Sequence, residues 1–133
     1  MTSIVTYLGD LRTSSIHLQS GTEILSDAPL DNNGKGEAFS PTDTVANALA
    51  TCMMTIMGIK ARDMKLDLKG STAKVIKIMN AEPRRLGAIE IAFEMHGTAE
   101  VKYRTILERA AMTCPVFLSL HPEIEKRIAF NWK

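Results

Sequence analysis

The chain has 133 residues, which is enough for one domain with a hydrophobic core, and its apolar fraction of 45% and charged fraction of 23% are typical of a globular protein. Its net charge of +1 argues against a nucleic-acid-binding surface and against a polybasic membrane patch. No apolar run approaches the roughly 18 residues that a membrane-spanning helix needs, and the N-terminal residues lack the features of a secretory signal. We therefore expect a cytoplasmic protein that binds neither nucleic acid nor membrane.

Three short strands are predicted at the start of the chain, over residues 4–8, 12–18 and 22–25. Gly9-Asp10 and Ser20-Gly21 separate them and favour turns. Residues 27–36 are rich in Asp, Asn, Pro and Gly, and this composition predicts a long loop before the next element.

A long helix is predicted to begin after this loop and to end near residues 61–63. Ser40 is a favourable N-cap, Pro41 suits the first helical position, and Asp43 falls where a capping box places an acid. Apolar residues recur at helical spacing along it, so we expect much of its surface to be buried. These residues are Val45, Ala46, Ala48, Leu49, Cys52, Met53, Ile56, Met57 and Ile59.

The second half of the chain contains three more predicted strands, over residues 72–79, 88–96 and 127–132, with helices over 101–112 and 115–120. In the middle strand, apolar residues alternate with Glu90 and Glu94, which predicts one buried face. In the first helix, the apolar face is expected to contain Val101, Ile106, Leu107 and Ala110. This element order predicts an α+β fold, with a largely antiparallel sheet packed on helices and a single domain over residues 1–133.

Two segments of the sequence resemble motifs of the OsmC and Ohr protein family. Residues 34–43, Gly-Lys-Gly-Glu-Ala-Phe-Ser-Pro-Thr-Asp, followed by Ala48-Leu49-Ala50-Thr51-Cys52, resemble its central-helix signature. That signature combines Ser/Asn-Pro, an acid, a helix of small residues and a reactive cysteine. Thr113-Cys114-Pro115-Val116 resembles the second cysteine of the family, which precedes a helix. The element order matches as well, so the resemblance extends over nearly the whole chain.

The resemblance implies an OsmC-like fold, in which antiparallel sheets from two chains wrap long central helices in an intertwined homodimer. It also implies a cysteine-based enzyme that reduces peroxides, especially organic hydroperoxides, at sites in the dimer interface. In such proteins the first cysteine becomes a sulfenic acid and the second closes a disulfide with it. External thiols, typically dihydrolipoyl groups, then reopen the disulfide, and no bound cofactor is needed.

Transferred to this chain, the resemblance implies Cys52 as the peroxidatic thiol and Cys114 as the resolving thiol. It also implies Arg12 as the assisting arginine and Asp43 as the assisting acid. Thr42 occupies the position where Ohr proteins carry glutamate, and Asp43 is one methylene shorter. The chain therefore resembles an OsmC-like protein more than a typical Ohr protein.

The cysteine chemistry needs a thiolate, because the thiolate and not the thiol attacks the peroxide. The apolar neighbours of Cys52 instead suit a buried structural cysteine. Cys114 is a predicted N-cap, where a helix dipole favours the thiolate, although an inert buried thiol suits its sequence equally well.

The charged residues also have simpler interpretations. Asp43 completes a capping box with Ser40 whether or not it assists catalysis, and Arg12 on its spacing alone is a solvated strand residue. Arg84 and Arg85, in a predicted hairpin turn, compete with Arg12 as the cation.

No metal site is expected, because the two cysteines and the three histidines (His17, His96 and His121) match no ligand spacing. The eight methionines suit a hydrophobic core or, in a second interpretation, a pliable pocket for the alkyl part of a hydroperoxide. Three functional hypotheses follow. The first is a two-cysteine peroxidase that acts on organic hydroperoxides, with hydrogen peroxide as a second substrate. The others are a non-catalytic dimer that binds small molecules and a thiol redox sensor.

Overall fold

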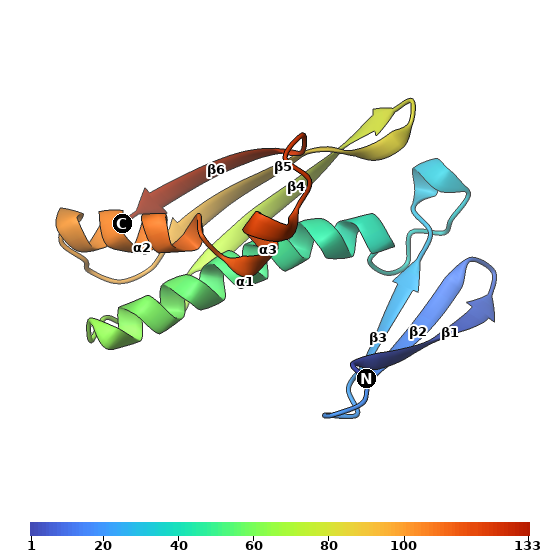
Figure 1. Cartoon of the computed structure of the whole chain (residues 1–133), viewed down its shortest axis with the longest axis horizontal. Coiled ribbons are helices and arrows are strands. Elements are labelled where there is room, and N and C mark those ends of the chain that lie inside the picture. The colour runs from blue at the N-terminus through green and yellow to red at the C-terminus, as the bar shows by residue number, and fades with distance from the viewer. The chain divides into compact units, whose positions relative to one another are not determined.

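The computed structural model describes all residues from 1 to 133, which form two compact units, Met1–Val45 and Ala46–Lys133. Each unit contains one three-stranded sheet, and the helices α1, α2 and α3 accompany the second sheet (Figure 1). The predicted α+β class is confirmed. All predicted strands and helices are present, with bounds that differ from the predicted ones by a few residues.

The first unit is built on an antiparallel meander of β1 (Ser3–Gly9), β2 (Arg12–His17) and β3 (Glu23–Asp27). A short 3-10 helix, η1 (Leu30–Asn32), lies in the loop that follows. This loop folds tightly, because the amide of Gly34 donates to the carbonyl of Pro29 at 2.9 Å. A Cβ atom on Gly34 would lie 1.6 Å from the carbonyl oxygen of Ala28, so only glycine fits at this position.

The first unit has no apolar core of its own. Its only buried residues are polar, Asp27 and Ser40. Large apolar side chains are exposed instead: Ile4, Val5, Tyr7, Leu8, Leu11, Leu18, Ile24, Leu25, Leu30 and Phe39. Isolated three-stranded sheets need a covered apolar face to be stable, so this sheet requires a covering surface.

Helix α1 (Pro41–Asp63) begins with the predicted capping box. The amide of Asp43 donates to Ser40 Oγ at 3.0 Å, and the amide of Ser40 donates to Asp43 Oδ2 at 2.9 Å. The helix ends where Lys65 adopts a left-handed conformation and the amide of Leu66 donates to the carbonyl of Ala61 at 2.8 Å. Both ends therefore agree with the prediction.

Helix α1 is also long and apolar enough, by length and composition, to cross a membrane. The expectation that no segment approaches this size was therefore wrong. The buried helix of a soluble core meets the same criteria, and α1 has six buried residues along one face: Ala46, Leu49, Ala50, Met53, Met57 and Ala61. These residues belong to the hydrophobic core, so we interpret α1 as a core helix.

The second unit contains β4 (Thr72–Ala81), β5 (Arg84–Met95) and β6 (Glu125–Trp132), in that order across the sheet. β4 and β5 form an antiparallel hairpin, whereas β6 pairs with β5 in parallel. The parallel pairing follows from the crossover through α2 (Val101–Ala111) and α3 (Pro115–Ser119), which lie with α1 on one side of the sheet (Figure 1). The predicted alternation in β5 is confirmed, because its buried face carries Ile89, Ile91, Phe93 and Met95.

The predicted apolar face of α2 was partly wrong. Leu107 is buried, as expected, but Val101 is 73% exposed and Ala111 is buried instead. The contacts of Trp132 explain the rotation. Its indole N–H donates to Glu108 Oε1 at 2.8 Å, and Arg104 lies over its ring, so these contacts fix which side of α2 faces the sheet.

Candidate functional site

The second unit places its two cysteine thiols beside each other. Cys52 is half-buried at the edge of the hydrophobic core on α1, and Cys114 is fully buried directly before α3. The Cys52 thiol is close enough to influence the ionisation of Cys114, and both cysteines are free thiols. The long helix and the α2–α3 junction thus bring together two residues that lie far apart in the sequence.

Cys114 is the N-cap of α3, as the sequence predicts. Its Sγ accepts a hydrogen bond from the amide of Phe117 at 3.3 Å. Burial nevertheless raises the pKa of the Cys114 thiol above its ordinary value, and the neighbouring Cys52 raises it further. The amide of Phe117 acts in the opposite direction but is outweighed. The expectation that the helix end would favour a thiolate was therefore wrong in its net effect, because α3 has only five residues and the site is buried.

This pair of thiols can undergo reversible two-electron oxidation. An oxidant that converts the more accessible thiol, Cys52, to a sulfenic acid would leave it next to a second sulfur. Cys114 could then displace water and close a disulfide. The protection of Cys114 by burial indicates that Cys52 reacts first with molecules that arrive from solvent.

In the first unit, Arg12 is held by two carboxylates. Its Nη2 donates to Asp27 Oδ2 at 3.2 Å and to Glu37 Oε2 at 2.8 Å. Asp27 is 1% exposed, whereas Glu37 is 60% exposed, so the Asp27 contact is the protected one. Arg12 and Asp27 also face each other in the β2–β3 register, which places the two side chains on the same face of the sheet.

The carboxylate of Asp27 is stabilised in its charged form. The amide of Glu37 donates to Asp27 Oδ2 at 3.0 Å, and this bond, together with the Arg12 guanidinium, holds the pKa of Asp27 below its ordinary value although burial acts against the charge. The two carboxylates in turn raise the pKa of Arg12. Arg12 is thus a fixed cation, with its guanidinium oriented by an acid from β3 and another from the loop.

Asp27 and Glu37 were missed by the sequence analysis, which predicted Asp43 as the acid that assists Arg12. In the structure, Asp43 forms the capping box with Ser40. The sequence did contain a signal for Asp27, because the short turn at Ser20-Gly21 makes β2 and β3 a hairpin. Only the exact register, however, identifies Asp27 as the partner of Arg12. The roles of Arg12 and Asp43 in catalysis remain predictions.

The competing cations occupy the start of β5. Arg85 pairs with Glu123 at 3.1 Å on the exposed surface, and Arg84 is the first residue of the strand. No group of three His, Cys, Asp or Glu side chains in residues 1–133 is placed to hold a metal ion. The thiol pair and the Arg12 cluster are therefore the candidate functional groups.

Comparisons with known proteins agree with the fold. The family model described as OsmC-like protein matches residues 34–128 of the chain. A crystal structure from Psychrobacter arcticus 273-4, provisionally named an osmotic stress induced and detoxification response protein, is 54% identical to the chain. Its TM-score is 0.95, over 98% of this chain and 96% of that chain. No curated protein sequence matches the chain.

More distant structures share the fold alone. An organic hydroperoxide resistance protein OsmC from Legionella pneumophila is 16% identical, with a TM-score of 0.72 over 98% of this chain and 97% of that chain. The organic hydroperoxide resistance protein OhrB of Bacillus subtilis is 14% identical, with a TM-score of 0.68 over 98% of both chains. An OsmC-like protein from Mycoplasma pneumoniae is 14% identical, with a TM-score of 0.80 over 98% of this chain and 94% of that chain.

Proposed function

The chain belongs to the OsmC-like protein family, and from this premise we propose that it is a thiol-dependent peroxidase that reduces organic hydroperoxides through Cys52 and Cys114. Hydrogen peroxide is the proposed second substrate. The observation that carries the proposal is the pair of neighbouring free thiols, one accessible and one buried. The presence of organic hydroperoxide resistance proteins among the structural neighbours supports a role in the response to peroxide stress.

The proposed reaction begins with the thiolate of Cys52. It attacks one oxygen of the peroxide, the O–O bond breaks, and the remaining alkoxide takes up a proton and leaves as an alcohol. Cys52 is then a sulfenic acid. The thiolate of Cys114 attacks its sulfur, a disulfide forms, and the hydroxyl group leaves as water.

The cycle is completed by an external dithiol, for which we propose a dihydrolipoyl group. Its first thiolate attacks the Cys52–Cys114 disulfide and forms a mixed disulfide with the protein. Its second thiolate then releases the protein in the dithiol form. The reductant supplies both electrons and both protons, so no resident cofactor is required.

We propose Arg12 as the cation that stabilises the Cys52 thiolate and orients the peroxide oxygens, with Asp43 as an assisting acid. The contacts to Asp27 and Glu37 support this role for Arg12, because a guanidinium held by two carboxylates keeps a fixed orientation. A fixed donor loses less conformational freedom when it binds a transition state.

We further propose that residues 1–133 form one domain of a cytoplasmic homodimer. The first unit supports the dimer, because its sheet exposes apolar side chains such as Val5, Tyr7 and Ile24 and has no buried apolar residue. A second copy of the chain would supply the missing cover. Sedimentation of the protein across a concentration series tests this part.

Steady-state peroxide consumption tests the activity. The reduced protein is supplied with excess dihydrolipoamide and either tert-butyl hydroperoxide or hydrogen peroxide, and the same assay is run on Cys52→Ser. We expect turnover with both peroxides, a higher kcat/KM for the organic one, and no turnover in Cys52→Ser. Equal, slow rates for wild type and Cys52→Ser would contradict the proposal.

A thiol redox sensor is the second candidate, and the burial of Cys114 is the observation that favours it. A buried thiol with a raised pKa closes a disulfide slowly, which suits a single switching event better than turnover. Oxidation of both thiols by one equivalent of peroxide, without further consumption in excess dihydrolipoamide, would favour the sensor over the peroxidase.

A further inference from the structure

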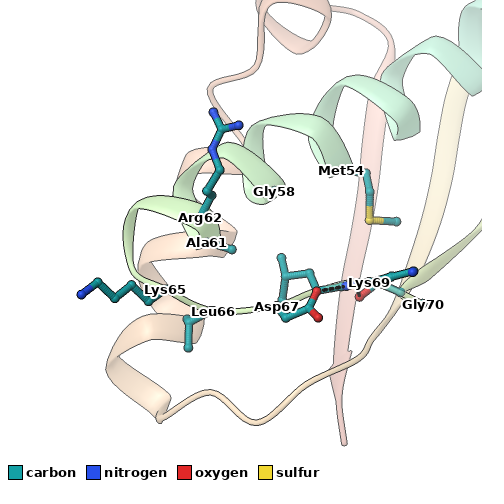
Figure 2. Close-up of a pocket in the computed structure, with 11 residues that line it drawn as sticks. Met54, Gly58, Ala61, Arg62, Lys65, Leu66, Asp67, Lys69 and Gly70 are labelled. Carbon is teal, nitrogen blue, oxygen red and sulfur yellow. Dashed lines mark hydrogen bonds between the residues drawn. The ribbon is translucent and has the colours of Figure 1, made fainter.

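A groove with a volume of about 630 Å³ opens beside the C-terminal half of α1 (Figure 2). One wall comes from α1 and the other from the loop that leads to β4. Its lining residues are Met54, Gly58, Ala61, Arg62, Lys65, Leu66, Asp67, Leu68, Lys69, Gly70 and Ser71. This volume lies within the range of small-molecule sites in proteins.

The groove is separate from the thiol pair. Successive residues of an α-helix are rotated by about 100°, so Met54, Gly58 and Ala61 lie on the flank of α1 opposite to Cys52. Neither cysteine lines the groove, and neither do Arg12 and Asp43. A ligand bound here would therefore not be a substrate at the proposed peroxidase site.

The floor of the groove is apolar. Met54, Leu66 and Leu68 are half-buried and Ala61 is buried, so their side chains offer hydrocarbon surface to a ligand. Gly58 contributes open space: a Cβ atom added there would meet no atom within 4 Å. Glycine disfavours a helix interior, and at this position its missing side chain leaves the wall of the groove open.

The margin of the groove is basic. Figure 2 shows the side chains of Arg62 and Lys65 extending from the helix end, and Lys69 on the loop side near Asp67. None of these three cations forms an ion pair. Asp67 is the only carboxylate that lines the groove, and its Oδ1 accepts the backbone amide of Lys69 at 2.9 Å.

The helix dipole accounts for only part of this charge. Cations in the last turn of a helix stabilise its C-terminal end, which explains Arg62 and also Lys60, which does not line the groove. Lys69 lies beyond the helix and gains nothing from the dipole. An apolar floor with an excess of positive charge at its margin is complementary to an amphipathic anion.

We propose that this groove binds an aliphatic carboxylate, with its hydrocarbon chain against Met54, Leu66 and Leu68 and its carboxylate between Arg62 and Lys69. Guanidinium and ammonium groups form charge-assisted hydrogen bonds with carboxylates, and the apolar floor removes the chain from water. The site gives the protein a small-molecule-binding function that does not depend on its thiol chemistry.

Calorimetric titration of the reduced full-length protein tests the proposal with three matched probes: decanoate, decanol and decyltrimethylammonium. The carboxylate is expected to bind at least about tenfold more tightly than the other two. Its affinity is expected to fall as salt is added. Equal binding of the alcohol or the ammonium probe would overturn the assignment of an anionic ligand.

Two variants locate the site. Gly58→Leu is expected to fill the groove and weaken decanoate binding by about tenfold or more, whereas Gly58→Ala improves the helix but is too small to block the ligand. Arg62→Gln combined with Lys69→Gln is expected to weaken binding by a similar factor, with Lys60→Gln as a matched control outside the groove. Unchanged affinity in both test variants would overturn the site.

Two further measurements separate this inference from the others. Cys52→Ser is expected to bind decanoate with wild-type affinity, so failure of the peroxidase proposal would leave this one intact. Gly58→Leu is expected to keep the sedimentation behaviour of the wild type. A change of oligomeric state in Gly58→Leu, together with no decanoate binding by the wild type, would show that a second copy covers the groove and would overturn the proposal.

Discussion

The thiol of Cys52 lies beside the thiol of Cys114, and the two differ sharply in accessibility. Cys52 is half-buried on α1, whereas Cys114 is enclosed and capped by the amide of Phe117. This asymmetry assigns the first contact with peroxide to Cys52 and protects Cys114 until a sulfenic acid forms next to it. The following predictions test each part of that order.

Replacement of the buried thiol should interrupt the cycle after its first step. In Cys114→Ser, we expect one equivalent of tert-butyl hydroperoxide to leave Cys52 as a sulfenic acid, because no second thiol is available to close the disulfide. Trapping with dimedone, read by intact mass, detects it. Excess peroxide should then yield sulfinic acid. A Cys114→Ser protein that turned over like the wild type would show that Cys114 is not the resolving thiol.

The rate of disulfide closure should rise with pH. Since burial raises the pKa of Cys114, its reactive thiolate is a minor species at neutral pH, and its fraction grows about tenfold per pH unit below the pKa. Stopped-flow records after sulfenic acid formation should therefore show faster closure from pH 6 to pH 8. A closure rate that is flat across this range would contradict a thiolate of raised pKa as the attacking group.

The same pKa shift predicts how stability depends on pH. The folded state favours the neutral Cys114 thiol, so this contribution is complete below the unfolded pKa of about 8.5 and is lost as pH rises through the higher folded pKa. Urea unfolding of the reduced protein at pH 7 and pH 9.5 should show a larger loss of stability in the wild type than in Cys114→Ala. Equal losses in the two proteins would disprove the link.

The buried carboxylate that holds Arg12 should matter more than the exposed one. Asp27→Asn removes a charge that is 1% exposed, whereas Glu37→Gln removes one that is 60% exposed and better solvated. We expect Asp27→Asn to lower the melting temperature and to reduce kcat/KM for tert-butyl hydroperoxide by about tenfold, with a smaller effect for Glu37→Gln. Arg12→Lys and Arg12→Gln serve as references for loss of the oriented guanidinium. Similar effects of both acid variants would argue against Asp27 as the main positioning group.

The two roles proposed for Asp43 can be separated by comparing it with its capping partner. Ser40→Ala and Asp43→Ala each break one half of the capping box and should each cost about 1 kcal/mol of unfolding free energy. Only Asp43→Ala should also lower the peroxidase rate, if its carboxylate assists the reaction. Equal activity of the two variants would restrict Asp43 to the cap.

Local chemistry made much of the fold predictable. The Ser40–Asp43 capping box and the alternation along β5 both depend on residues close in sequence, and both are present as predicted. The parallel pairing of β6 and the face of α2 were not predictable in this way. They depend on how the chain crosses between strands and on the distant contact of Trp132 with Glu108.

The candidate site shows the same division. Cys52 and Cys114 were identified through family motifs, since nothing in their spacing places two thiols together. Asp27 was missed as the partner of Arg12, because a strand register cannot be read from composition and a shift of one residue would turn Asp27 to the other face.

The most direct test of the account is an anaerobic reaction of the fully reduced protein with one equivalent of tert-butyl hydroperoxide, followed by thiol counting and peptide mapping. The account predicts that both thiols disappear and that a Cys52–Cys114 disulfide forms within one chain, with one alcohol released per disulfide. Two thiols that remain free after all the peroxide has been offered, or a disulfide between chains in place of the Cys52–Cys114 bond, would contradict it.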